Sequence, residues 1–277
     1  MREQQPFTEW IGRKSESVDV ITPRLVASFR AIFEPNLAPV NEEAAPLGMH
    51  WCLSPAIVPM GGLGQDGHPA LNRDLPPVPQ PRRMWAGGSI ETHGELRAGD
   101  TVRRVSTIAG IERKEGRSGE LWFVAVDHDY VTDRGLAIRE RHDIVYRDEA
   151  KPGVHASAPA AKELRPADEA WIVETPSTLL FRYSAITFNG HRIHYDLPYA
   201  RDVEGYEGLV VHGPIQATLL YNFAAGVGGG APSRFQYRGI SPAISGRPLA
   251  VKHSLAEGLF WTEGPDGLVH MESRVRA

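Results

Sequence analysis

The feature that most constrains the fold of this 277-residue chain is an approximate internal repeat. A stretch with a Thr-Pro pair and apolar residues at helical spacing occurs twice, at 21–33 (ITPRLVASFRAIF) and 175–186 (TPSTLLFRYSAI). Each copy is followed by runs of strand-like residues that are divided by Gly and Asp, as in antiparallel strands joined by turns. The last run of the first half, GLAIRERHDIV, resembles the last run of the second half, GLVHMESRVRA. A repeat of this length predicts two copies of one fold in a single chain.

The helical segments of the two halves differ in the part that follows the first helix. In the first helix Thr22 is expected to be the N-cap and Pro23 the first helical residue. The segment 208–226 predicts a further helix in the second half, opened by Gly213-Pro214 and capped by Gly226. The corresponding segment 46–62 is interrupted by three prolines and is expected to form only short helical pieces. Helices against antiparallel strands in each half give an α+β fold class.

The Ala- and Pro-rich stretch 151–168 is expected to be a linker between residues 1–150 and residues 169–277. A hydrophobic content of 42% and a charged content of 23% are typical of soluble globular proteins. The net charge of −4 gives no indication of a nucleic-acid or membrane surface. The lone cysteine, Cys52, fits a reducing cytoplasm, and we expect neither a signal peptide nor a membrane span.

The stretch FNGHRIHYD, residues 188–196, concentrates two histidines, an asparagine and an aspartate in nine positions. Its composition alone is compatible with a metal site, a proton-transfer site or a polar loop. The metal interpretation takes as ligands His191, His194, Asp196 and His212. A spacing of three brings two imidazoles together only in a helix, and Gly190 argues against a helix there. We therefore expect no metal. The Gly-rich stretch 226–230 lacks the Gly-Lys-Ser/Thr of a phosphate loop and is expected to be a turn after the helix.

Residues 182–213 as a whole resemble the signature of MaoC-like, (R)-specific enoyl hydratases of the hot-dog fold. His194 falls on the catalytic histidine of that family, Asp196 on the aspartate after it, and His212-Gly213 on the His-Gly at the start of the central helix. Together with QPRRMWAGG (80–88), the variant NGHRIHYD resembles one branch, the 3-methylfumaryl-CoA (mesaconyl-C4-CoA) hydratases and the type 2 hydroxyacyl-thioester dehydratases. The resemblance implies a double hot-dog, a covalent pseudo-dimer in which the first half binds substrate and the second carries the chemistry.

One departure from the family pattern affects the chemistry. The catalytic aspartate of the family lies five residues before the histidine, and Asn189 occupies that position here, with His191 in place of the family's asparagine. An amide cannot transfer a proton as a carboxylate does, although it can hold a water molecule. We expect His194 to be the main acid/base, Asn189 to position water and the Gly213 N–H to bind the enolate oxygen at the helix start. The donor of the α-proton stays open between His194, His191 and an aspartate of the second half.

The remaining site residues are expected to support or bind the substrate. Asp196 is expected to cap the next turn or to orient His194, and His212 either contributes to the site or only caps the helix. Candidates for a substrate carboxylate or a CoA phosphate are the guanidinium groups of Arg82, Arg83 and Arg192. Trp85 is either a wall of the acyl pocket or part of the core.

The resemblance implies a hydro-lyase that acts on an enoyl-CoA thioester, with a short branched dicarboxylic substrate such as 3-methylfumaryl-CoA, hydrated to citramalyl-CoA. Coenzyme A enters as part of the substrate, and no metal or redox cofactor is expected. The alternatives are a dehydratase of longer 3-hydroxyacyl thioesters in fatty-acid or polyketide metabolism, a non-catalytic acyl-CoA binder and a thioesterase. A homodimer of double hot-dogs and a cytoplasmic location are expected, without nucleic-acid or membrane partners.

Overall fold

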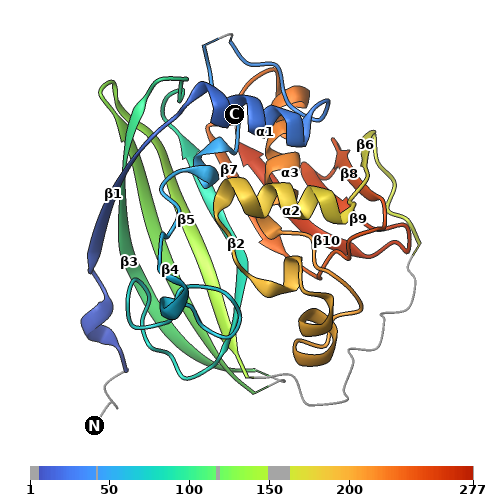
Figure 1. Cartoon of the computed structure of the whole chain (residues 1–277). Helices are drawn as coiled ribbons and strands as arrows, with labels where there is room; N and C mark the ends of the chain where they lie inside the picture. The colour runs from blue at the N-terminus through green and yellow to red at the C-terminus, as the bar shows by residue number, and fades with distance from the viewer. Residues whose placement is uncertain (1–5, 42, 117–118, 149–162, 277) are drawn as a thin grey trace.

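The strands of the described residues form one antiparallel, ten-stranded sheet in the order β1-β3-β4-β5-β2-β7-β10-β9-β8-β6 (Figure 1). The computed structural model describes residues 6–41, 43–116, 119–148 and 163–276. The strands are β1 (Lys14–Val20), β2 (Arg82–Thr92), β3 (Thr101–Gly116), β4 (Gly119–Thr132), β5 (Gly135–Arg147), β6 (Glu169–Val173), β7 (Arg234–Gly239), β8 (Leu249–Ser254), β9 (Leu259–Glu263) and β10 (Val269–Arg276). The helices are α1 (Pro23–Phe33), α2 (Ser177–Thr187) and α3 (Gly213–Gly228), with 3-10 turns at Thr8–Trp10 (η1), Met49–Cys52 (η2), Met60–Gly62 (η3) and Arg192–His194 (η4) and a π-helical turn at Tyr199–Val203 (η5).

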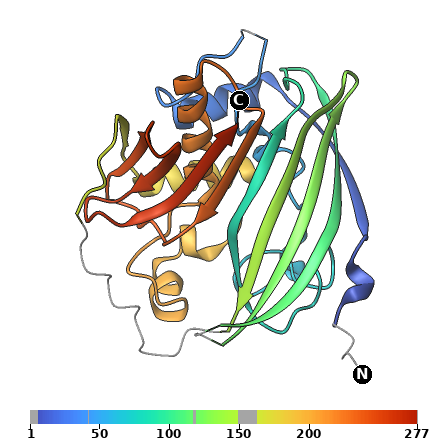
Figure 2. The ribbon, with the colours of Figure 1, turned by 180° about the vertical axis from the view of Figure 1, so that it is seen from behind.

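The sheet repeats one topology in its two halves. Read from its outer edge inward, the first half has the order β1-β3-β4-β5-β2 and the second half the order β6-β8-β9-β10-β7. The two resembling runs of the sequence, which form β5 and β10, therefore occupy equivalent places. The halves join where β2 pairs with β7, with Ile90 opposite Phe235. Figure 2 shows both halves from behind, with the helices on the far side of the sheet. The architecture is the α+β double hot-dog that the sequence predicted.

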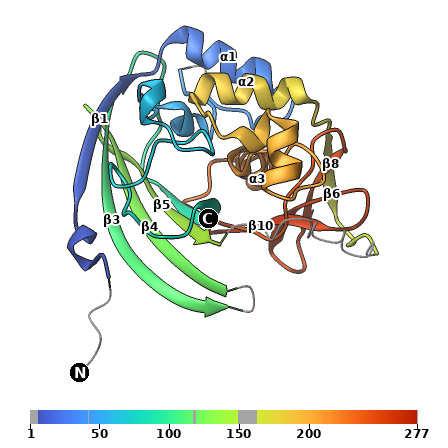
Figure 3. The same cartoon turned by 60° about the horizontal axis from the view of Figure 1, so that its bottom comes forward.

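Helix α1 begins as the sequence predicted. The Thr22 hydroxyl oxygen accepts a hydrogen bond from the Leu25 N–H at 3.1 Å, and Pro23 is the first helical residue. Helices α1 and α2 lie side by side within the curve of the sheet (Figure 3). The ring of Phe33 on α1 meets the ring of Tyr183 on α2 edge-on, at a centroid distance of 5.9 Å. This contact joins the two equivalent helices, and so the two halves, on the side of the sheet that faces away from the viewer in Figure 2.

Helix α3 is the central helix of the second half, and every residue from Ile215 to Ala225 is buried. The prediction that Gly226 caps this helix is wrong. The helix continues to Gly228, because Val227 still packs against the core, and it ends at Gly229, whose φ of +74° is the left-handed conformation that glycine adopts at C-caps. The Gly-rich stretch predicted as a turn is therefore helical in its first three residues.

Two strands were not predicted. Strands β1 and β6 form the two outer edges of the sheet, and most of their side chains are exposed. The segment 46–62 forms only the short turns η2 and η3, as its prolines predicted. Most of the predicted linker, residues 151–162, lies outside the described residues. Of the described helices, none combines the length and the apolar character that a membrane span needs.

Candidate active site

Three histidines gather between the end of α2 and the start of α3. Helix α2 ends at Thr187, and Phe188 takes a left-handed φ of +49° that turns the chain into the η4 turn. The rings of His194 and His212 are stacked at a centroid distance of 3.5 Å, and the ring of His191 stands perpendicular to that of His194 at 5.3 Å. All three side chains are buried. The structure thus brings together the histidines that the sequence singled out.

Hydrogen bonds fix the orientation of two of these rings. The Nδ1 of His194 lies 2.7 Å from the carbonyl oxygen of Val210. Because a carbonyl only accepts, Nδ1 carries the hydrogen, and the Nε2 of a neutral ring keeps its lone pair. The Nε2 of His212 lies 2.9 Å from the hydroxyl of Ser184 on α2. His194 is therefore held in a tautomer that can accept a proton at Nε2.

The histidines are neutral at neutral pH. Burial lowers the pKa of His194 to about 4, although the bond to Val210 opposes this effect. Burial, followed by electrostatic repulsion between protonated His191 and the neighbouring His194 and Arg83, lowers the pKa of His191 to about 2. Burial also lowers the pKa of His212 well below its usual value. In the resting site these groups are consequently proton acceptors rather than acids.

Gly213, the first residue of α3, lies directly under the ring of Trp85. A Cβ on Gly213 would lie 2.6 Å from Cε3 of Trp85, so a larger residue would collide with the indole. In the first turn of α3 Pro214 has no N–H, and the Ile215 N–H donates to the His212 oxygen at 3.1 Å, whereas the Gly213 N–H has no hydrogen-bond partner among the described residues. The helix dipole makes this end of α3 attractive to negative charge. Trp85 also packs against Trp51 and Tyr237, with centroid distances of 5.8 and 4.8 Å. It is therefore part of the core and also lies against the helix start.

Asn189 and Asp196 both stabilise turns of the motif. The Oδ1 of Asn189 accepts the N–H of His191 at 3.0 Å, whereas its amide nitrogen has no hydrogen-bond partner among the described residues. The Oδ1 of Asp196 accepts the N–H of Tyr199 at 3.1 Å, and its Oδ2 pairs with Arg192 at 2.8 Å. Asp196 thus caps the next turn, the first of the two roles that the sequence left open.

The three candidate arginines have different surroundings. Arg192 is paired with Asp196, and Arg82 is paired with Glu204, whose carboxylate and main-chain oxygen both accept its hydrogen bonds. Arg83 lies close enough to the cluster for its charge to lower the pKa of His191. No carboxylate of the described residues forms an ion pair with Arg83. Of the three, it is the one whose charge remains available to a ligand.

Sequence reasoning missed a loop of the first half that reaches the motif. The ring of His68 lies 4.3 Å from that of His191, and ligand atoms of Asp66, His68 and His191 all lie within 4.8 Å of one another. Two imidazoles and a carboxylate are a donor set suited to a transition metal. Of the four metal ligands considered from the sequence, this set contains only His191. Asp196, another of those four, is paired with Arg192 instead. The loop, GQDGHPA, carries no periodicity, so only its Asp-Gly-His composition signals a site.

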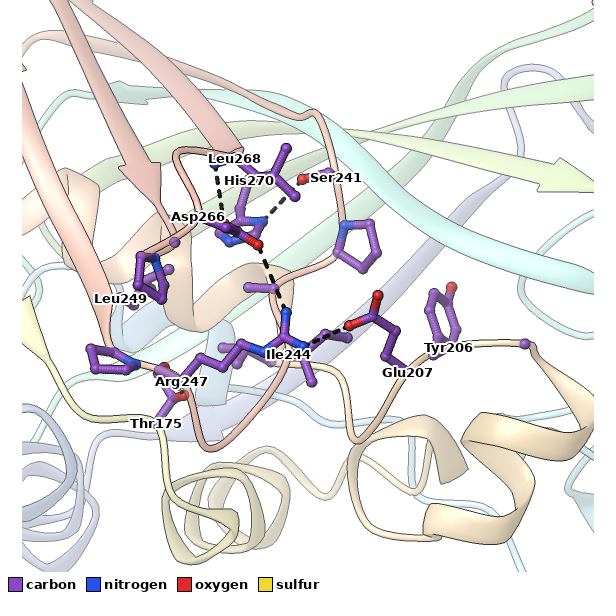
Figure 4. A pocket seen from close by; sticks show the side chains of 17 residues that line it. Thr175, Tyr206, Glu207, Ser241, Ile244, Arg247, Leu249, Asp266, Leu268 and His270 are labelled. Atoms are coloured by element: carbon purple, nitrogen blue, oxygen red, sulfur yellow. Dashed lines mark hydrogen bonds and ion pairs between the residues drawn. The ribbon is translucent and has the colours of Figure 1, made fainter. Parts of the chain in front are cut away.

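A pocket of about 160 Å³ lies elsewhere in the second half (Figure 4). Arg247 crosses it and is held by Glu207 at 2.7 Å and by Asp266 at 3.8 Å. None of the predicted site residues lines this pocket, although Gly205, Tyr206, Glu207 and Val211 from the second part of the stretch 182–213 do. The histidine cluster, rather than this pocket, is the candidate active site.

Comparisons with known proteins agree with the fold and the motif. A family model described as hydroxyacyl-thioester dehydratase type 2 matches residues 48–245. The mesaconyl-C(4)-CoA hydratase of Chloroflexus aurantiacus is 39% identical over 272 residues, which cover 96% of each chain. The crystal structure of HtdX of Mycobacterium tuberculosis matches with a TM-score of 0.67 at 14% identity, over 96% of this chain and all of that one. Another Mycobacterium tuberculosis protein, with a double hot-dog fold, matches with a TM-score of 0.56 at 12% identity, over 96% of this chain and 95% of that one.

Proposed function

The chain belongs to the hydroxyacyl-thioester dehydratase type 2 family, and we propose that it is a hydro-lyase that adds water to, or removes it from, an enoyl-CoA thioester. The observation that carries this proposal is the ring of His194, buried beside the start of α3 with Nδ1 bonded to Val210 and Nε2 free to take a proton. Hydration needs such a base next to a group that binds an enolate oxygen.

The proposed reaction uses one imidazole for both proton transfers. His194 Nε2 takes a proton from water while the oxygen forms a bond to the β-carbon. The electron pair of the double bond moves onto the thioester as an enolate, whose oxygen accepts the Gly213 N–H at the start of α3. The proton on His194 then passes to the α-carbon, so that one water has been added and His194 is neutral again. The amide nitrogen of Asn189 holds the water.

We propose a substrate with a free distal carboxylate, of the 3-methylfumaryl-CoA kind. Arg83 carries this proposal, because Arg82 and Arg192 are already paired with carboxylates of the protein. A guanidinium binds a carboxylate through two parallel hydrogen bonds, which favours a dicarboxylic over a simple acyl chain. The name of the Chloroflexus aurantiacus relative, a mesaconyl-C(4)-CoA hydratase, agrees with this substrate class.

An absorbance assay for loss of the enoyl-thioester double bond tests the reaction. The protein is compared with its His194→Gln variant, using crotonyl-CoA and 3-methylfumaryl-CoA side by side. We expect His194→Gln to lower kcat about 10²–10⁴-fold, the usual contribution of an acid–base group. His93→Gln is the matched control, because the His93 side chain is 42% exposed. Near-wild-type turnover by His194→Gln would show that His194 is not the base.

The substrate class is tested with Arg83→Gln. We expect this variant to lose turnover of the dicarboxylic substrate and to keep that of crotonyl-CoA. Arg238→Gln is the control, because the Arg238 side chain is 73% exposed. Equal loss with both substrates would remove Arg83 from the specificity argument.

A second candidate function is dehydration of longer 3-hydroxyacyl thioesters, and the description of the matching family model favours it. A preference of the wild-type protein for monocarboxylic chains in the same panel would select this alternative. Tight binding of CoA thioesters without turnover would instead indicate a non-catalytic acyl-CoA binder.

For either hydro-lyase we propose that CoA enters only as part of the substrate and that the reaction uses no metal or redox cofactor. We also propose that the protein forms a homodimer. We propose a cytoplasmic location, because a chain with one cysteine, Cys52, fits a reducing compartment.

A further inference from the structure

The loop 64–68 of the first half is fixed onto the catalytic motif of the second half by main-chain contacts. The N–H of Arg192 donates to the carbonyl oxygen of Asp66 at 2.9 Å, and Arg192 Nη1 donates to that of Gln65 at 3.1 Å. Gly67 and Gly190 meet backbone to backbone, since a Cβ on Gly190 would lie 2.7 Å from the Gly67 oxygen. The two loops therefore have no room for side chains between them and sit in one relative position.

The loop is also closed upon itself. The Gly64 N–H donates to the His68 oxygen at 2.7 Å, the Gly67 N–H donates to the Gly64 oxygen at 3.0 Å, and the His68 N–H donates to Asp66 Oδ1 at 3.0 Å. Gly67 has a φ of +84°, which a larger residue would rarely adopt. These bonds hold the partly buried side chains of Asp66 and His68 close to that of His191.

The position of Asp66 and His68 brings to the cluster a carboxylate that has no arginine partner among the described residues. Ligand atoms of Asp66 and His68 lie within 4.8 Å of one on His191, whose ring adjoins that of His194. Burial, followed by electrostatic repulsion between protonated His68 and the neighbouring Arg83 and His191, lowers the pKa of His68 well below its usual value, so His68 is neutral. Charged and titratable groups surround the cluster on every side: Arg82 and Arg83 on β2, Tyr146 on β5, Asp66 and His68 on the loop, Arg192, Asp196, Tyr199 and Glu204 in the motif, Tyr183 on α2 and His212 at the start of α3.

Of these groups, Asp196 is paired with Arg192, and Asn189 stands at the position where the wider MaoC-like pattern has a catalytic aspartate. When His194 takes a proton from water, a positive charge forms in a buried site that already contains Arg83. Such a charge is costly in a poorly solvated site unless a negative charge lies nearby. Asp66 is the carboxylate that faces the cluster without an arginine partner among the described residues.

We propose that Asp66 and His68 are positioning residues that the first half contributes to the active site. Asp66 supplies the negative charge that position 189 lacks and stabilises the imidazolium formed during turnover, and His68 holds the ring of His191 between the carboxylate and His194. This inference rests on the proposed function, because it concerns the protonated state of His194 in that reaction. It makes the first half a participant in the chemistry rather than only a binding surface.

The test is Asp66→Asn in the hydration assay, with Asp66→Glu as the conservative variant. We expect Asp66→Asn to lower kcat about 10–100-fold, by analogy with the loss seen when the carboxylate partner of a metal-bound histidine is removed, with KM changed less than about twofold. Without the carboxylate the imidazolium is less stable, so the acidic limb of the pH profile of kcat/KM moves to lower pH. Asp66→Glu should recover part of kcat and return the limb toward the wild-type position. His68→Gln should lower kcat less than Asp66→Asn does.

Asp74→Asn is the matched control, because Asp74 is half exposed and its one ion pair with the described residues is to the neighbouring Arg73. Urea unfolding of each variant separates a change in the site from a loss of the fold. If the wild type turns over and Asp66→Asn keeps both kcat and the acidic limb, the inference is overturned and the proposed function stands. If the wild type hydrates no enoyl-CoA, the proposed function and this inference fall together. Loss of activity in EDTA with recovery on added Zn²⁺ would also overturn it, because Asp66, His68 and His191 would then be metal ligands.

Discussion

Lowering the pH from 7 to 5 is expected to destabilise the folded protein through His191 and His194. An unperturbed histidine has a pKa of about 6.5, and in the folded protein burial lowers the pKa to about 2 for His191 and about 4 for His194. Below pH 6.5 the unfolded chain therefore binds protons that the folded protein does not. Wherever the unfolded state binds more protons than the folded state, the free energy of unfolding decreases as the pH is lowered. The contribution that each neutral histidine makes to the free energy of unfolding is therefore fully present above pH 6.5, and it is lost as the pH falls from 6.5 toward the pKa of that histidine in the folded protein.

The size of the effect follows from these pKa values. At pH 5 either histidine is almost fully protonated in the unfolded chain, and both are mostly neutral in the folded protein. Linkage converts this difference into a loss of about 2 kcal/mol for each histidine relative to pH 7. The two losses together are a large part of the roughly 5–15 kcal/mol by which domains are stable.

Urea unfolding followed by tryptophan fluorescence, at pH 7 and at pH 5, measures this loss. His191→Gln and His194→Gln replace each ring by a group that does not titrate, so each variant should lose about 2 kcal/mol less than the wild type between the two pH values. His93→Gln should keep the wild-type pH dependence, since that side chain is 42% exposed. The reasoning would be refuted by a wild type with the same urea midpoint and slope at both pH values. It would equally fail if His194→Gln were as sensitive to acid as the wild type.

Two further predictions concern residues around the site. Gly213→Ala places a methyl group 2.6 Å from Trp85, and this overpacking should lower the free energy of unfolding in urea by about 1–3 kcal/mol and lower kcat/KM. Gly226→Ala in the same helix, where a Cβ would have no atom within 4 Å, should lower neither quantity. Equal behaviour of the two variants would contradict this prediction. Glu140→Leu removes a fully buried carboxylate that accepts the Trp51 indole N–H at 2.6 Å. We expect the free energy of unfolding to fall by about 3–5 kcal/mol in urea unfolding. A loss below about 1 kcal/mol would mean that the Glu140 carboxylate contributes little to the stability of the fold.

Features of the fold that depend on local sequence were predictable. The start of α1 was predicted because the cap, Thr22, and the first helical residue, Pro23, are neighbours in the sequence. The edge strands β1 and β6 were not, because an edge strand with exposed side chains carries no apolar alternation to reveal it. The end of α3 was misplaced from Gly229 to Gly226 because several glycines follow one another there, and only packing of the intervening residues decides which of them caps the helix.

The site was predictable where it is continuous in the sequence. His191, His194 and His212 lie within one motif, and the resemblance to a known family aligned them. The choice among the arginines was beyond sequence reasoning, because it depends on partners such as Glu204 that lie far along the chain. The loop 64–68 was missed for the same reason: more than a hundred residues separate it from the motif that it touches, and its residues have no periodic pattern.

The place of that loop in the fold explains how the first half gains a role in the site. In the second half the segment between the first helix and the next strand forms α3, whereas the equivalent segment of the first half is divided by prolines into short turns. Because this segment of the first half is not helical, it can extend to the second half, where the main-chain carbonyl oxygen of Asp66 accepts the N–H of Arg192. Two identical subunits would have to carry both the helix and the loop in every copy. In a single chain each half keeps one of them, so the half without the catalytic motif can supply the carboxylate that position 189 of the other half lacks.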